Sequence, residues 1–170
     1  MKIVFDTLSD EIFQKIVGEL NIKIPSPLWN TSTVLWDNIL KQGLPGSVIT
    51  TPVSEELAKL IEDSIKDKVP KYDRMIVQFY LWQGSSGIAI HNDENHGFGA
   101  TIYINTSWHP NSGGWFIWQD KHNKEWKTLL PEKNVMVVND EEEEHLVTAI
   151  EPYPPEPRVT IQIWGETNDK

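Results

Sequence analysis

The sequence contains no cysteine, which excludes disulfide frameworks, zinc knuckles, Fe–S clusters and cysteine nucleophiles. It also lacks any apolar run near the roughly 20 residues of a membrane-spanning helix, and its first residues become charged too early for a secretory signal. Basic residues are few, with 15 Lys and Arg against 25 Asp and Glu and a net charge of −10, so we expect no nucleic-acid partner. These absences predict a cytoplasmic protein without a membrane partner, either an acidic enzyme or a binding domain.

Tryptophan, by contrast, is abundant, with 8 in a chain of 170 residues. Trp buries a large area and is enriched in strands, so a packed β core is the first interpretation. A carbohydrate-stacking surface is the alternative, and it would make the chain a Trp-rich binding module. The length fits a single domain over residues 1–170, which we divide into a helical support region, residues 1–72, and a β core, residues 73–167.

Three stretches near the N-terminus place apolar residues at three- and four-residue steps, which predicts helices. They are residues 12–20, 35–40 and 57–65. The third is the clearest, because Ser54 can cap its start and Pro70 prevents its continuation.

From Arg74 onward the apolar period changes to two, which is typical of strands. Short strand-like runs, separated by turns rich in Gly and Pro, follow one another: RMIVQFYLWQ, SGIAIH, FGATIYIN, GGWFIWQ, EWKTLL, NVMVV, HLVTAI and RVTIQIW. Because no helix lies between them, they predict a mainly β fold, an all-β sandwich or jelly roll, with the N-terminal helices packed on one face.

A candidate metal site comes from two of these runs. His91 and Asp93 end one strand-like run, and residues two apart in an extended chain point to the same side, so they can converge. His145 begins another run. Two histidines and one carboxylate form the facial triad of non-haem Fe(II) oxygenases, which leaves coordination positions open. Taken alone, a His-x-Asp triplet also fits a hydrogen-bonded loop pair.

The last strand-like run carries an arginine on an otherwise core-like element. One side of the run is apolar, and the other presents Arg158 and Thr160. A buried guanidinium without a partner is very costly, so an inward-facing Arg158 requires an anion. Its planar fork matches a carboxylate, to which the Thr160 hydroxyl can add a third bond. A salt bridge to a glutamate is the alternative; next to a facial triad, we favour a ligand carboxylate.

The ordered set His91-x-Asp93, His145 and Arg158-x-Thr160 resembles the Fe(II)/2-oxoglutarate-dependent oxygenases, and within them the prolyl hydroxylase-like branch. The resemblance covers over half of the chain. It implies the double-stranded β-helix (jelly roll) fold of that family, with Fe(II) held by the two histidines and the aspartate, which would be both the metal-binding and the catalytic residues.

Further residues stand where this branch has them. Tyr80 precedes the strand that enters the metal site, Tyr103 lies on the following strand, and Trp164 follows Arg158 by six residues. The resemblance implies that Arg158 and Tyr103, together with Thr160, hold the far carboxylate of 2-oxoglutarate, and that Tyr80 lies beside it. The implied reaction consumes O2 and 2-oxoglutarate and hydroxylates a substrate, with ascorbate as a supporting reductant.

The substrate is the point on which the sequence leaves alternatives open. The branch favours a prolyl residue in a peptide or protein, whereas the short chain fits a free amino acid or small metabolite nearly as well. The acidic run at residues 140–144 is by itself typical of a solvated loop. The resemblance implies that this loop lies near the mouth of the site, so we expect it to attract a basic substrate. A cupin-type metalloprotein without 2-oxoglutarate chemistry and the Trp-rich binding module are the rival classes. Nothing in the sequence indicates an oligomeric state.

Overall fold

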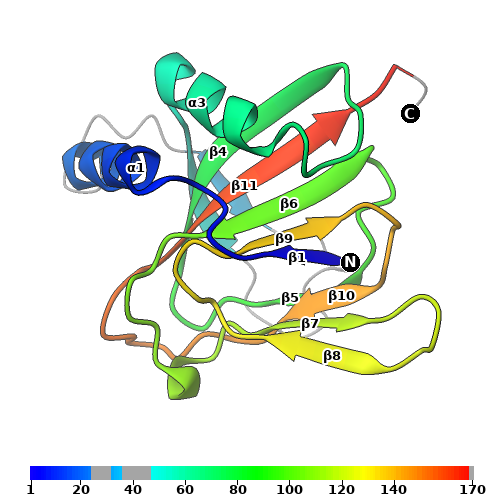
Figure 1. The fold of residues 1–170 in the computed structure, drawn as a ribbon. Helices are drawn as coiled ribbons and strands as arrows, with labels where there is room; N and C mark the ends of the chain where they lie inside the picture. The colour runs from blue at the N-terminus through cyan, green and yellow to red at the C-terminus, as the bar shows by residue number, and fades with distance from the viewer. Residues whose placement is uncertain (24–31, 36–46, 169–170) are drawn as a thin grey trace.

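The computed structural model describes residues 1–23, 32–35 and 47–168, which form two antiparallel sheets and two α-helices (Figure 1). The large sheet contains, in spatial order, β1 (Lys2–Val4), β9 (Met136–Asn139), β6 (Phe98–Tyr103), β11 (Arg158–Glu166), β4 (Arg74–Trp82), β3 (Ser47–Pro52) and β2 (Ser32–Leu35). The small sheet contains β5 (Ile88–His91), β10 (His145–Val147), β7 (Phe116–Gln119) and β8 (Trp126–Leu129). The helices are α1 (Asp10–Lys23) and α3 (Glu55–Ile65), and a short 3-10 helix, η1 (Pro110–Ser112), precedes β7.

The mainly β class predicted from the sequence is confirmed. Each of the eight strand-like runs after residue 73 contains a strand, from β4 to β11. The two-residue period is clearest in β11, because alternate residues of a strand face opposite sides of a sheet and its Val159, Ile161 and Ile163 all pack on one apolar side.

The first 72 residues contain more than the predicted helices. β1, β2 and β3 also lie there, and all of them join the large sheet. The sequence of β3, SVITTP, is rich in β-branched residues that suit a pleated sheet, and this strand pairs with β4. The helix predicted at residues 35–40 is wrong at Leu35, which ends β2, and its other residues lie outside the described part of the chain.

The start of α3 also differs from the prediction in detail. Ser54 occupies the N-cap position, but its hydroxyl makes no capping bond. It donates instead to Glu19 Oε2 at 2.6 Å, while the Ser54 backbone N–H donates to Glu19 Oε1 at 2.9 Å. Glu19 belongs to α1, so these bonds join the two helices rather than stabilise the first turn of one.

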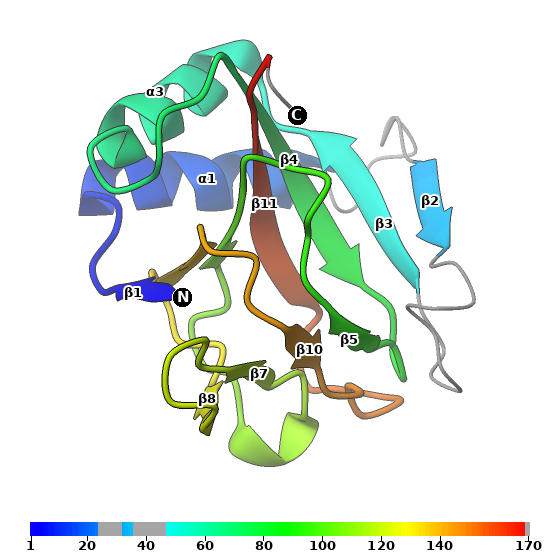
Figure 2. The same ribbon diagram turned by 90° about the vertical axis from the view of Figure 1, so that its right-hand side faces the viewer.

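Two clusters of buried side chains occupy opposite faces of the large sheet. In the first, Phe13 of α1 and Ile61 of α3 belong to the same cluster as Ile161 of β11. The second contains Tyr103 of the large sheet and Phe116 of the small sheet. The helices and the small sheet therefore lie on opposite sides of the large sheet, as Figures 1 and 2 show.

Three of the described tryptophans, Trp82, Trp108 and Trp118, belong to the second cluster or pack against it, as the first interpretation of their abundance expected. Trp82 and Trp118 are buried, and among the described tryptophans only Trp126 reaches half exposure, at 50%. Trp29 and Trp36 lie outside the described residues.

Within the described ranges, no helix has the length and apolar character needed to cross a bilayer.

Candidate functional site

A cavity of about 430 Å³ lies between the two sheets and is lined by residues of β4, β5, β6, β7, β9, β10 and β11. Alternation along β11 explains its polar character. Ile161 and Ile163 pack in the helix-side cluster, whereas Arg158, Gln162 and Trp164 line the cavity. The single strand thus supplies core on one face and site residues on the other.

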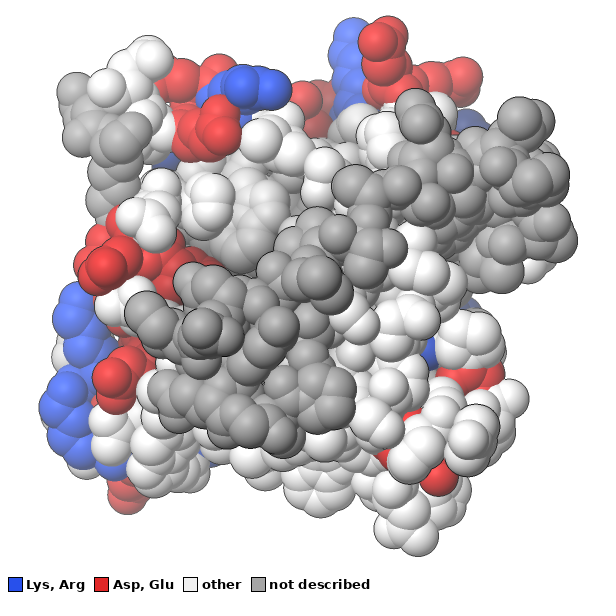
Figure 3. Space-filling model, turned by 180° about the vertical axis from the view of Figure 1, so that it is seen from behind, with Lys and Arg blue, Asp and Glu red and all other residues white. Residues whose placement is uncertain are grey.

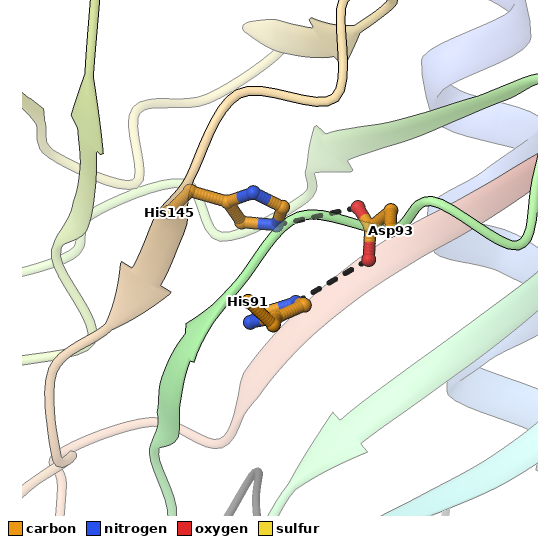
Figure 4. Close-up of side chains that lie close together, drawn as sticks. All are labelled: His91, Asp93 and His145. Carbon is orange, nitrogen blue, oxygen red and sulfur yellow. Dashed lines mark ion pairs between the residues drawn. The ribbon is translucent and has the colours of Figure 1, made fainter.

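His91, Asp93 and His145 form a metal-donor trio in the cavity wall, with one potential ligand atom from each residue lying within 4.8 Å of the others. His91 ends β5, His145 begins β10, and the two are directly opposite in the antiparallel pair. The Asp93 carboxylate lies between them, with Oδ1 at 3.3 Å from His91 Nε2 and Oδ2 at 3.3 Å from His145 Nε2 (Figure 4). Two imidazoles and a carboxylate on one side of a point suit iron or manganese, with positions left for other ligands.

The prediction that His91 and Asp93 converge is confirmed, but the reason differs from strand alternation. β5 ends at His91, and Asp93 has a left-handed backbone with φ of 59°. Asp tolerates this conformation better than most residues, because its short side chain can bond locally. The turn after β5, rather than an extended strand, therefore brings the carboxylate back over the histidine.

Both histidine rings are oriented by backbone carbonyls. Nδ1 of His91 lies 2.8 Å from the Ala89 carbonyl oxygen, and Nδ1 of His145 lies 2.9 Å from that of Glu143. Carbonyls only accept, so Nδ1 carries the hydrogen in each ring and Nε2 is directed at Asp93. Such bonds fix the tautomer and raise the basicity of the nitrogen available to a metal.

Burial and mutual contacts shift the pKa values of the trio in different directions. Burial opposes ionisation of Asp93, but its contacts with the His145 and His91 rings hold the pKa of its carboxyl well below the usual range. For His91 burial acts to lower the pKa, and the contact with Asp93 outweighs it and raises the pKa. For His145 the effect of burial is larger than the opposing effect of Asp93, so the pKa is lowered. A divalent cation requires an ionised carboxylate and neutral imidazoles, and the lowered pKa values of Asp93 and His145 favour those forms of the two groups.

Another part of the cavity carries a buried positive charge. Arg158 is 1% exposed, and its guanidinium lies 4.3 Å from the centre of the Trp82 ring. Nη2 donates to the Gly114 carbonyl oxygen at 3.2 Å, whereas Nε and Nη1 have no partner among the described residues. Burial lowers the pKa of Arg158 to about 10, so the group is still charged at neutral pH.

Tyr103 lies beside this guanidinium with its own polar atom unused. The centre of its ring is 5.6 Å from the Arg158 guanidinium carbon, and its buried hydroxyl has no partner among the described residues. Burial raises the pKa of Tyr103 to about 12, so the hydroxyl keeps its proton and can donate it to an acceptor. Buried polar atoms are almost always bonded, so these three unpaired donors fit an anionic ligand in the cavity.

The other two residues predicted to contact a ligand lie differently. Tyr80 lines the cavity, its pKa is raised by burial, and Trp164 forms a hydrogen bond with its hydroxyl. Thr160 is fully buried, and its Oγ1 accepts the indole N–H of Trp82 at 3.1 Å. Thr160 lies on the same face of β11 as Arg158, directly opposite Tyr80 and Tyr103 in the sheet, but it is not among the residues that line the cavity. Its contact with a ligand stays a prediction.

Two residues at the metal-donor end were not identified from the sequence. Gly99 of β6 lies directly against Asp93: a Cβ atom there would be 2.9 Å from Asp93 Oδ2 and 2.9 Å from Trp164 Cζ3. Asn139 of β9 pairs with Gly99 across the sheet and also lines the cavity. Neither residue type is a usual metal ligand, and only their position in the fold connects them with the trio.

The acidic run at residues 140–144 has partners within the chain. Glu143 is buried, accepts the Lys121 backbone N–H at 2.9 Å and forms an ion pair with the N-terminal amine. Glu141 pairs with the side chains of Lys121 at 3.8 Å and His122 at 3.5 Å. In the view from behind, basic and acidic side chains likewise lie beside one another at the margin (Figure 3). The basic substrate stays a prediction.

The sequence matches no protein family model and no curated protein. Solved structures nevertheless share its fold. A prolyl hydroxylase from Trichoplax adhaerens, in complex with a peptide fragment of the hypoxia inducible factor oxygen degradation domain, superimposes with a TM-score of 0.76 at 14% identity, over 99% of this chain and 84% of that one.

Two bacterial proteins match similarly. A Pseudomonas putida prolyl-4-hydroxylase has a TM-score of 0.67 at 12% identity, over 98% of this chain and 92% of its own. A Burkholderia pseudomallei oxidoreductase of the 2OG-Fe(II) oxygenase family has a TM-score of 0.66 at 10% identity, over 97% and 86%. The resemblance noted from the sequence is thus confirmed in three dimensions: the chain has the fold of 2OG-Fe(II) oxygenases, prolyl hydroxylases among them.

Proposed function

We propose that this chain is an Fe(II)- and 2-oxoglutarate-dependent oxygenase that hydroxylates its substrate. One observation carries the proposal: a single cavity contains both a two-histidine, one-carboxylate donor trio and a buried guanidinium with two unpaired N–H donors. A metal site alone would fit a cupin-type protein. The unpaired guanidinium adds the requirement for an anion in the same cavity.

The spacing of the two features supports a dicarboxylate that joins them. Gly99, beside Asp93, and Tyr103, beside Arg158, both lie on β6 and are four residues apart, which is about 13 Å of strand. The trio at one level and Arg158 with Tyr103 at the other line the same cavity. A small dicarboxylate can therefore contact the metal with one end and Arg158 with the other.

The residues of the chain bind and orient the reactants. His91, Asp93 and His145 would hold Fe(II), with the rings fixed by the bonds of their Nδ1 atoms to backbone carbonyls. Arg158 and Tyr103 would donate hydrogen bonds to the far carboxylate of 2-oxoglutarate. When bound, Fe(II) and 2-oxoglutarate supply the oxidative chemistry by which O2, 2-oxoglutarate and a substrate C–H group become succinate, CO2 and a hydroxylated product. Ascorbate would keep the metal reduced.

Apolar side chains complete the site by restricting water. Phe116 of β7 stacks on the His145 ring at 5.1 Å between centroids and lines the cavity together with Val137 and Val147. Exclusion of water strengthens the charge interactions of the ligands and protects the reaction from side processes.

We assign the two sheets and this apolar lining to a double-stranded β-helix (jelly roll), with α1 and α3 as its helical support.

For the substrate we propose a prolyl residue within a polypeptide. Two of the solved structures that share the fold are prolyl hydroxylases, one of them bound to a peptide. A surface hollow adjoins the cavity mouth, since Asn95 and His96 line both. A further hollow shares Asp73 and Thr167 with the first. Hollows that share lining residues with the cavity and with each other support an extended chain over a free amino acid or small metabolite.

The experiment that tests the activity measures succinate. Anaerobically purified chain is loaded with Fe(II) and ascorbate, given 2-oxoglutarate and air, and analysed by mass spectrometry, with and without a library of proline-containing peptides. We expect succinate from the wild type and none from His91→Ala or Arg158→Ala. The controls are His122→Ala and Lys15→Ala, which change exposed residues outside the cavity and its neighbouring hollows and should keep the activity.

Binding of 2-oxoglutarate to the Mn(II)-loaded chain is measured in parallel. Equal succinate from His91→Ala and the wild type would contradict the metal assignment. If the wild type produced no succinate and also bound no 2-oxoglutarate, the proposed function would be contradicted. A peptide that gains one oxygen atom on proline would establish the substrate class, whereas 2-oxoglutarate turnover stimulated only by free amino acids would overturn it.

A further inference from the structure

Asn139 is a buried amide that contacts both segments carrying the metal-donor trio. It is the last residue of β9 and is 6% exposed. It belongs to the large sheet, whereas His91 and His145 belong to the small sheet. The side chain of Asn139 therefore crosses from one sheet to the other at the position where the donors converge.

The amide makes bonds to each donor segment. Nδ2 donates to the carbonyl oxygen of Asn92, the residue between His91 and Asp93, at 3.1 Å. On the other side, Oδ1 accepts the Glu143 backbone N–H at 3.0 Å, and Nδ2 lies 3.4 Å from the Glu143 carbonyl oxygen. That same carbonyl oxygen accepts Nδ1–H of His145.

The orientation of the amide follows from its partners. Two carbonyl oxygens face Nδ2 and one N–H faces Oδ1, so the reversed orientation would place acceptor against acceptor and donor against donor. Asn139 Nδ2 also lies 3.4 Å from His145 Nδ1. This contact is not a hydrogen bond, because His145 Nδ1 donates its hydrogen to the Glu143 carbonyl oxygen. The side chain thus has one orientation, which fixes the two donor segments relative to each other.

We propose that Asn139 is a positioning residue that sets the distance between the His91–Asp93 turn and His145, and so the affinity of the trio for its metal. The inference rests on the proposed metal site. It adds that the site depends on one buried amide that is not itself a ligand. Bonds that orient ligands from outside the coordination sphere are commonly worth 10- to 100-fold in metal affinity, by order of magnitude.

Asn139→Asp is the main test, because it keeps the shape and the acceptor but replaces the donor by an oxygen that repels the carbonyl oxygens of Asn92 and Glu143. Asn134→Asp is its matched control. Asn134 is also buried, and it accepts the Leu8 N–H at 3.0 Å and donates to the Leu8 carbonyl oxygen at 2.8 Å, away from the trio. Both changes remove a buried donor, but only one of them lies at the proposed site.

Mn(II) is the probe, with free Mn(II) measured by electron paramagnetic resonance during titration of the chain. We expect Asn139→Asp to raise the Kd for Mn(II) by about 10- to 100-fold and Asn134→Asp to leave it unchanged. Urea unfolding of the metal-free variants shows whether the two lose similar stability. The absorption band of bound Co(II) should change only in Asn139→Asp, since it reports coordination geometry.

Asn139→Ser removes the donor without adding charge and is measured in the same way, in case the aspartate variant does not fold. Wild-type affinity in either folded Asn139 variant would overturn the inference, as would an equal loss of affinity in Asn134→Asp. A wild type that binds Mn(II) no better than His91→Ala would overturn the proposed metal site itself, and the inference with it. The two failures are therefore distinguishable.

Discussion

Replacing Arg158 by methionine should stabilise the ligand-free chain while abolishing its response to 2-oxoglutarate. Burial lowers the pKa of Arg158 to about 10, which corresponds to roughly 3 kcal/mol against the charged form in the folded state. Because the folded chain holds this proton less tightly than the unfolded chain, the cost is full below about pH 10 and disappears as the pH rises toward the ordinary pKa of a guanidinium. At pH 7 the whole cost applies.

The substitution also removes favourable contacts. The cation–π contact with Trp82 is worth about 1 kcal/mol, and the hydrogen bond to the Gly114 carbonyl oxygen about 1 kcal/mol more. Methionine retains an unbranched apolar side chain of similar length to fill the space. The removed burial cost of roughly 3 kcal/mol exceeds these two lost contacts, so we expect Arg158→Met to raise the free energy of unfolding by roughly 1 kcal/mol.

Urea unfolding at pH 7, followed by far-UV circular dichroism, measures this difference, with Arg74→Met as the exposed control expected to stay within about 0.5 kcal/mol. With Mn(II) present, 2-oxoglutarate at 100 times its Kd should stabilise the wild type by about 2.7 kcal/mol and Arg158→Met not at all. A variant that is about 2 kcal/mol less stable than the wild type without ligands, or one that 2-oxoglutarate still stabilises, would refute the reasoning.

Two further predictions concern neighbouring residues. Gly99→Ala places a Cβ atom 2.9 Å from Asp93 Oδ2, so it should displace the carboxylate and weaken Mn(II) binding about tenfold in a calorimetric titration, with wild-type affinity as the contrary outcome. Burial raises the pKa of Tyr103 to about 12, so the unfolded chain releases this proton first and the free energy of unfolding should fall between pH 10 and 12. Tyr103→Phe should make that decline shallower in urea titrations at several pH values and weaken 2-oxoglutarate binding severalfold at pH 7; an unchanged slope would contradict the assignment.

β11 could be predicted because its apolar residues alternate with polar ones. β8, which is mostly exposed, and β9, which is buried throughout, have no alternating face and could be predicted only as short runs between turns. β1 and β3 were missed for different reasons. β1 has three residues, too few for a period, and it exists through its pairing with β9. The β-branched residues of β3 are a detectable indication of a strand, but β3 stands between stretches with a helical period.

The residues of the site divide in the same way. His91, Asp93 and His145 could be found because their chemistry is specific, and an inward-facing Arg158 followed from alternation. Asn139 could not be found, because it acts through backbone atoms of residues that only the fold brings near. Side-chain chemistry can be recognised in a sequence, whereas support from a neighbouring strand depends on tertiary position.

The place of β11 in the large sheet has a consequence for how the protein is made. β11 is the last of the described strands, yet it lies at the centre of the sheet, bonded to β4 on one side and β6 on the other. During synthesis β4 and β6 emerge first, and both keep an open edge until residues 158–166 leave the ribosome. Open edges recruit other chains, so the nascent protein passes through an aggregation-prone period that ends when its central strand arrives. A chain cut before Arg158 would remain in that state.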